Sequence, residues 1–186
     1  HQAPGSWGFF FAPNPMKIEF ITDNQNASKA IKNLQEYPKL CADTETTGLQ
    51  ATVAKIRLLQ LCDASPSETN RTVYVFDLFK TTVVPELKTL IETREMLVGH
   101  NLGFDLQFFF SMGIDFRNKI FDTYLAERVL RAGFQEKRMS PKLNKPYFAD
   151  VSCSLKAVAE RRLDLEVDKE QRLTDWSVDE LTLEQV

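Results

Sequence analysis

Two carboxylates near the start of the chain, Asp43 and Glu45, are the first residues whose spacing indicates chemistry. Residues 40–42 are apolar and typical of a buried strand, and the turn formers Thr47 and Gly48 follow. Because side chains alternate between the two faces of a strand, Asp43 and Glu45 project to the same side. Neighbouring anions are costly unless a cation neutralises them or one takes a proton. The pair therefore indicates a metal site, although a polar strand end running into a turn has the same composition.

A third carboxylate, Asp105, lies in a second acidic element. The apolar residues 96–98 predict a strand, and the sequence GHNLGFDL (99–106) then predicts a helix that carries Asp105 in its first turn. A carboxylate at that position is also favoured by the helix dipole alone. A purely structural role explains each acidic element separately, but it explains less well why both occur in one chain.

These elements resemble two motifs of a nuclease superfamily. DTETTGL (43–49) is similar to the first motif, and HNLGFD (100–105) to the second, of the DEDD 3'-5' exonucleases. Within that superfamily the chain is most similar to ribonuclease D and to the proofreading domain of family A DNA polymerases, with Werner-type exonucleases near by. Residues 154–185 are similar to the approach to the third motif, a Tyr and then an Asp on one helix. We expect that motif within roughly two helical turns after Gln185.

The resemblance implies hydrolysis of phosphodiester bonds at the 3' end of single-stranded DNA or RNA, with release of nucleoside monophosphates. It implies two divalent ions, and all-oxygen ligands favour Mg²⁺ or Mn²⁺ over zinc. Asp43 would be shared by both ions, Glu45 would hold the ion that activates water, and Asp105 the ion on the leaving-group side. The implied substrate-binding residues, with Phe104 against the terminal nucleotide, are Thr46, Leu49, His100, Asn101 and Phe104.

Several alternatives stay open. A non-catalytic nucleic-acid or protein binding module on the same fold would retain both motifs. DNA and RNA are not distinguished, because the first two motifs are shared by both branches, although residues 58–62 are more similar to the ribonuclease D pattern. A polymerase or another domain in the same polypeptide is equally compatible with the sequence.

Composition indicates a single domain of 186 residues with a net charge of -3. An acidic balance does not favour nucleic-acid binding by itself, but a local basic rim is sufficient. Cys41, Cys62 and Cys153 form no Cys-x-x-Cys pair, which favours a reducing interior such as the cytoplasm. No apolar run is long enough to span a membrane. We interpret residues 1–15 as an N-terminal extension, either foreign to the natural chain or part of a longer protein, and residues 16–186 as the exonuclease domain.

The expected elements give an α/β fold. An alternating strand over 16–22 precedes a helix over Ala30, Ile31 and Leu34, capped by Asn26 or Ser28. The strand with Asp43 and two further strands with short connections predict an antiparallel meander. Helices and strands then alternate, which predicts a mixed sheet flanked by helices, consistent with the ribonuclease H-like fold that the resemblance implies. The expected ranges are strands 56–62, 72–76, 96–98 and 116–121, and helices 85–93, 102–112 and 122–131.

The later part of the chain carries further signals. Asp122 is interpreted as a helix cap, and Ser154 as the cap of an amphipathic helix with Leu155, Val158, Ala159 and Leu163 inward. Trp176 is interpreted as a core residue. Residues 128–145 are rich in Lys and Arg and interrupted by Gly and Pro, which predicts a flexible basic loop. Such a loop is either solvated surface or a rim that holds phosphates.

Overall fold

The computed structural model describes residues 17–64, 71–165 and 175–181. Its centre is a six-stranded mixed sheet in the order β1-β4-β3-β2-β5-β6. The middle three strands, β2, β3 and β4, form the antiparallel meander that the sequence predicts, whereas β1, β5 and β6 pair in parallel with their neighbours. The strands are β1 (Lys17–Ile21), β2 (Lys39–Thr46), β3 (Ile56–Asp63), β4 (Thr72–Asp77), β5 (Met96–Gly99) and β6 (Lys119–Asp122).

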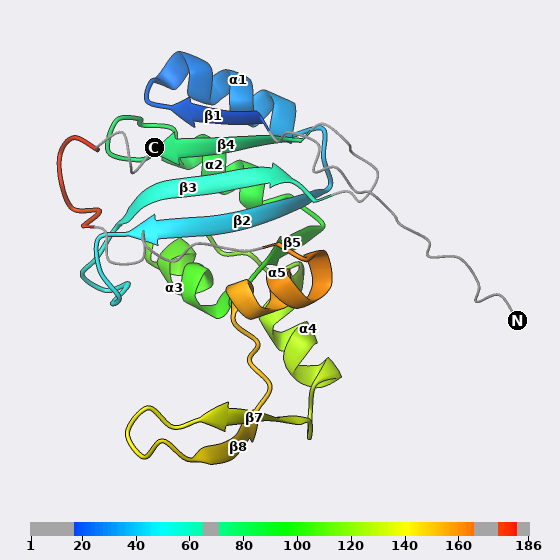
Figure 1. Ribbon diagram of the computed structural model, residues 1–186. Coiled ribbons are helices and arrows are strands. Elements are labelled where there is room, and N and C mark those ends of the chain that lie inside the picture. Colours follow the sequence, from blue (N-terminus) through cyan, green and yellow to red (C-terminus); the bar gives the residue numbers. More distant parts are fainter. Residues whose placement is uncertain (1–16, 65–70, 166–174, 182–186) are drawn as a thin grey trace, which may run out of the picture.

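Helices cover both faces of this sheet. In Figure 1, α2 lies behind β3 and β4 and α3 lies below β2, whereas α5 lies in front of β5. The core fills the space between the sheet and the helices behind it, with buried side chains such as Leu59, Phe76, Leu90 and Phe108. The predicted α/β architecture is therefore confirmed. The helices are α1 (Asn24–Leu34), α2 (Val84–Glu92), α3 (Gly103–Ser111), α4 (Thr123–Leu130) and α5 (Leu155–Leu163).

Ionic contacts attach α5 to α4. The Glu127 side chain of α4 is 3% exposed. Its Oε1 accepts hydrogen bonds from Arg131 Nε (3.1 Å) and Arg161 Nη1 (2.6 Å), and its Oε2 accepts from Arg162 Nη2 (3.0 Å). The prediction of an apolar inward face on α5 is wrong in part. Only Ala159 of α5 is buried, whereas two of the expected inward residues, Leu155 and Leu163, are 45% and 65% exposed.

Other local predictions have mixed outcomes. The caps Asp122 and Ser154 and the burial of Trp176 are confirmed. The cap of α1 is Asp23, not Asn26 or Ser28, because its carboxylate accepts a hydrogen bond from Asn26 N at 2.8 Å. The strand expected over 116–121 begins only at Lys119.

The basic segment is not a flexible loop. Residues 135–150 form a second, two-stranded sheet of β7 (Gln135–Met139) and β8 (Pro146–Asp150). Pro141 lies at its bend and Pro146 begins β8, so neither proline interrupts a strand. The interpretation of residues 1–15 and much of the expected approach to the third motif lie outside the described residues. Within the described ranges no helix combines the length and apolarity needed to cross a bilayer.

Candidate active site

Strand β2 carries the first two candidate carboxylates. Ala42 and Thr44 are buried, whereas Asp43 is exposed and Glu45 is half-buried. Asp43 and Glu45 therefore lie on the face of the strand away from the buried pair, as the pleat predicts. The pairing of β2 with β3 shifts register between Glu45 and Thr46, so the regular ladder ends where the carboxylates lie.

Asp105 comes to this strand from the neighbouring element. Parallel pairing of β2 with β5 sets Cys41 opposite Val98, and the chain then turns into α3 with Asp105 in its first turn. The Asp105 carboxylate is buried and accepts a hydrogen bond from the Thr44 hydroxyl at 2.6 Å. One hydroxyl of β2 thus fixes the position of the third candidate carboxylate.

Burial and neighbouring charges affect the ionisation of both aspartates. Although the Asp43 residue is exposed overall, desolvation of its carboxylate and the nearby Asp105 charge raise the pKa of Asp43 to about 6. Burial also raises the pKa of Asp105, against the Thr44 hydrogen bond, and the Asp122 charge adds to the rise. Negative charge is therefore costly at this point of the sheet, and a positive charge placed there would be stabilised.

The loop before α3 is held by Asp122. Its Oδ1 accepts hydrogen bonds from Asn101 N and Tyr124 N, both at 2.9 Å, and its Oδ2 accepts from Leu102 N at 3.0 Å. Asn101 has a φ of 65°, in the left-handed region that asparagine tolerates better than most residues. Asp122 therefore does more than cap α4, because it also fixes the turn that delivers Asp105.

Gly99 and His100 belong to the same turn. A Cβ on Gly99 would lie 2.5 Å from Leu102 Cδ2 and 2.8 Å from the Ala42 carbonyl oxygen, so only glycine fits there. The His100 Nδ1 lies 2.9 Å from Thr123 Oγ1. These contacts explain both residues as parts of the support beneath Asp105, and a substrate contact of His100 stays a prediction.

The remaining predicted substrate-binding residues surround this turn and the end of β2. Phe104 is half-buried, and its ring centroid lies 5.0 Å from that of Phe108. Thr46 Oγ1 donates to the Gly48 carbonyl at 2.7 Å, which closes the turn after β2. Leu49 is 85% exposed. These arrangements leave the side chain of Leu49, and part of Phe104, accessible to a ligand.

Comparison of the chain with models of protein families identifies its family. A model described as 3'-5' exonuclease matches residues 18–186. The chain belongs to the 3'-5' exonuclease family. The prediction from the two acidic motifs is thereby confirmed.

Relatives of this exonuclease domain include DNA polymerase I of Aquifex aeolicus, which is 32% identical over 167 residues. The match covers 90% of this chain and 24% of the polymerase. The structure of Escherichia coli RNase D, an exoribonuclease involved in structured RNA processing, has a TM-score of 0.66 at 19% identity. That match covers 91% of this chain and 40% of RNase D, and it supports the ribonuclease H-like fold.

Brucella melitensis NrnC has the same fold. Its structure bound to pGG has a TM-score of 0.61 at 21% identity, and the match covers 92% of this chain and 72% of NrnC. A second structure, described as NrnC with bound Mg²⁺, has the same TM-score at 19% identity. That second match covers 91% of this chain and 70% of NrnC.

The donor atoms of the exonuclease site suit a hard divalent cation. Asp43, Glu45 and Asp105 offer only carboxylate oxygens, which Mg²⁺ and Mn²⁺ prefer. The raised pKa of Asp43 shows that the site already disfavours its own negative charge. In the described part of the chain, however, no three His, Cys, Asp or Glu side chains form a group that could hold a metal ion. The charge of Asp105 nevertheless acts on the Asp43 carboxylate, and a ligand role for Glu45 beside these two aspartates stays a prediction.

Sequence reasoning missed Arg57 of β3. This arginine is fully buried, and its Nη2 lies 3.0 Å from Asp77 Oδ2. It also donates to the backbone carbonyls of Val178 and Asp179, and its guanidinium lies 4.6 Å from the Phe79 ring centroid. The signal available was a charged residue within an otherwise apolar strand, where burial requires a partner. Arg57 fixes part of the chain that precedes the expected third motif.

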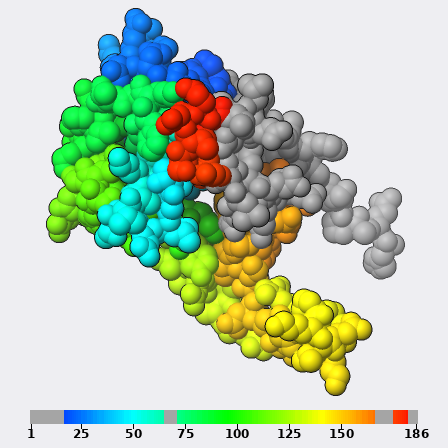
Figure 2. All heavy atoms as spheres, turned by 90° about the vertical axis from the view of Figure 1, so that its left-hand side faces the viewer, coloured from blue at the N-terminus to red at the C-terminus, as the bar shows by residue number. Residues whose placement is uncertain are grey.

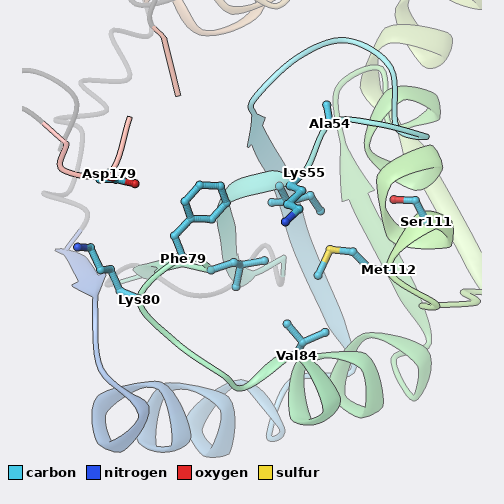
Figure 3. Close-up of a pocket in the computed structure, with 10 residues that line it drawn as sticks. Ala54, Lys55, Phe79, Lys80, Val84, Ser111, Met112 and Asp179 are labelled. Atoms are coloured by element: carbon cyan, nitrogen blue, oxygen red, sulfur yellow. The ribbon is translucent and has the colours of Figure 1, made fainter. Parts of the chain in front are cut away.

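A cavity of about 630 Å³ lies beside this contact. Figure 3 shows Phe79, Lys55, Met112 and Val84 around it, with Lys80 and Asp179 at the side of residues 175–181. None of the three candidate carboxylates lines this cavity. Its size therefore does not identify it as the predicted catalytic site, whose candidate carboxylates lie on β2 and in the first turn of α3.

Proposed function

We propose that this domain hydrolyses phosphodiester bonds at the 3' end of single-stranded nucleic acid and releases nucleoside monophosphates. The observation that carries the proposal is the proximity of Asp43 and Asp105, with Thr44 fixing the position of Asp105. Two carboxylates with raised pKa values on adjacent elements are typical of a site built for catalysis. Membership of the 3'-5' exonuclease family supports the direction of hydrolysis.

We propose Mg²⁺ or Mn²⁺ as the cofactor, as two ions held by Asp43, Glu45 and Asp105. A bound divalent cation supplies a more acidic water and stabilises charge on the leaving oxygen. The protein's own contribution is to hold the carboxylates: Thr44 orients Asp105, and Asp122 fixes the turn before it. The structure of NrnC with Mg²⁺ supports the choice of ion.

The substrate is proposed to lie across the exposed end of β2 and the turn before α3. Leu49 and Phe104 would contact the terminal nucleotide, while Thr46, His100 and Asn101 would border it. The relatives support both kinds of strand, because one is a DNA polymerase and another is an exoribonuclease. A polymerase domain in the same polypeptide is one context for the domain. The three free cysteines support a reducing compartment such as the cytoplasm.

The test is release of mononucleotides from 5'-labelled single strands of DNA and of RNA, with Mg²⁺, with Mn²⁺ and with a chelator. We expect cation-dependent shortening from the 3' end. Asp43→Asn and Asp105→Asn should each lower the rate by about 100-fold or more while the chelated protein still binds the strand. The matched control is Asp115→Asn, which changes an exposed aspartate paired with Arg117 and should leave the rate unchanged.

The outcomes separate the enzyme from a binding module. Strand binding without release in either cation would support the non-catalytic module. Retention of activity by Asp43→Asn would show that Asp43 does not belong to the reacting centre. A preference of the wild-type rate for DNA or RNA identifies the substrate class.

A further inference from the structure

The β7–β8 hairpin is an ordered arm that the candidate site does not use. Its strands pair from Gln135 with Asp150 to Met139 with Pro146. Ser140 N donates to the Lys145 carbonyl at 3.0 Å and so closes the bend. Figures 1 and 2 show the hairpin standing out from the rest of the described chain, beyond α4 and α5.

The two faces of the hairpin differ. Arg138 pairs across the strands with Tyr147, and on this face Arg138 forms an ion pair with Glu136 and donates to the Asp150 carbonyl at 3.1 Å. Lys137 pairs with Phe148 on the opposite face, because directly opposed residues share a face. The first face is therefore occupied with contacts of its own.

The second face presents apolar and basic side chains to solvent. Phe148 is 70% exposed and Met139 is 57% exposed. Lys137, together with Lys142 and Lys145 at the bend, has no ion-pair partner within the described ranges. A two-stranded ribbon cannot bury such a face by itself. We give the name arm face to Lys137, Met139 and Phe148 of this second face together with Lys142 and Lys145 of the adjoining bend.

We propose that the arm face binds single-stranded nucleic acid upstream of the 3' end, with Phe148 stacked on a base and Lys137, Lys142 and Lys145 on phosphates. The chemistry favours this partner because stacking on an aromatic ring is tolerant of sequence and lysines neutralise phosphates. The charge is complementary as well, since these unpaired lysines stand out from a chain whose net charge is -3. This inference rests on the proposed function, because it assigns the hairpin to the same strand.

The position of the arm face predicts a dependence on strand length. Helix α4 starts at the turn that holds Asp105 and rises roughly 12 Å before the hairpin begins. A strand with its 3' end at Asp43 must therefore extend several nucleotides before it reaches Phe148. Short oligonucleotides should not use the arm face.

The test is fluorescence anisotropy of the chelated protein with labelled strands of about 20 and about four nucleotides. Phe148→Ala should weaken binding of the long strand by about tenfold, and Phe148→Trp should retain it, because stacking needs a ring and not only an apolar surface. Binding of the short strand should not change. Neither variant should change the urea midpoint, since Phe148 is largely exposed.

A double variant tests the phosphate contacts. Lys137→Ala with Lys145→Ala should lower the slope of log affinity against log salt by about 1.4 for the long strand. The matched control, Lys29→Ala with Lys32→Ala, removes two exposed lysines of α1 and should leave that slope almost unchanged. Equal effects of the two double variants would show that only net charge matters and would overturn the proposal.

Other outcomes also overturn it. If Phe148→Ala binds the long strand as tightly as the wild type does, stacking on Phe148 is excluded. If the substitution weakens binding of the short strand equally, the hairpin acts only through the rest of the fold. Mononucleotide release from the short strand in Mg²⁺ or Mn²⁺ reports on the carboxylate site separately. Failure of the proposed function would abolish that release, whereas failure of the arm face would leave it intact.

Discussion

The contact between α4 and α5 allows a quantitative prediction. Burial alone would raise the pKa of Glu127, but hydrogen bonds from Arg131, Arg162 and Arg161 outweigh it and lower the pKa from 4.5 to about 2. A shift of this size corresponds to about 3 kcal/mol. Because the three arginines are themselves 24% to 46% exposed, solvent screening reduces it. We expect Glu127→Gln to lower the free energy of unfolding by about 2 kcal/mol near pH 7.

The sign of the pH dependence follows from the lowered pKa. A carboxylate that is more acidic in the folded state stabilises the fold fully above its unfolded pKa, here 4.5. That contribution is lost as pH falls through 4.5 toward 2, and it should be about half gone near pH 3. The difference in unfolding free energy between Glu127→Gln and the wild type should therefore become smaller over the same pH range.

Urea unfolding followed by circular dichroism at several pH values measures both effects. The control is Glu160→Gln, which removes an exposed carboxylate 3.7 Å from Lys156 and should cost less than about 0.5 kcal/mol. A cost for Glu127→Gln no larger than that of the control would refute the reasoning. A difference in unfolding free energy between the wild type and Glu127→Gln that stays constant from about pH 7 to pH 3 would also refute it, because the ion cluster would then not be the source of that difference.

Four further substitutions test the site and its support. Gly99→Ala should destabilise by about 2 kcal/mol, because the added Cβ would lie 2.5 Å from Leu102, whereas Gly103→Ala meets nothing within 4 Å and should be neutral or stabilising in urea unfolding. Asp122→Ala should lower the thermal midpoint by removing a cap worth about 1 kcal/mol, and more through the lost loop contacts. Asp43 has a raised pKa of about 6, so it favours the fold only while protonated and this stability is lost as pH rises through 6. Asp43→Asn should thus raise the unfolding free energy above pH 6 by about 1 kcal/mol after solvent screening, and an unchanged value in urea titrations would contradict this.

The sequence predicted the strands and the carboxylate positions well where local rules suffice. Alternation along β2 separates Asp43 from buried Thr44, and the turn after β5 delivers Asp105 to the same region. Both patterns depend on neighbours within a few residues. The hydroxyl of Thr44 was not predicted as a partner of Asp105, because that contact joins residues 61 positions apart.

The misses come from tertiary contacts and from competing local signals. Arg57 could not be assigned a role, since its partners on residues 178–179 lie more than a hundred positions away. Asp23, Asn26 and Ser28 are all suitable caps, and only the first accepts the hydrogen bond. In the basic segment the turn formers suggested a loop, but Pro141 lies at the bend of a hairpin, Gly133 precedes its first strand, and Pro146 begins its second strand.

The way Arg57 holds residues 178 and 179 has a consequence for sequence variation. Its guanidinium binds their backbone carbonyls, so the contact depends on the path of the main chain and not on the identity of either side chain. Homologous chains could exchange Val178 or Asp179 freely and still dock this segment. An exchange of Arg57 for lysine would not be equivalent, because an ammonium lacks the planar fork that serves two carbonyls and Asp77 at once.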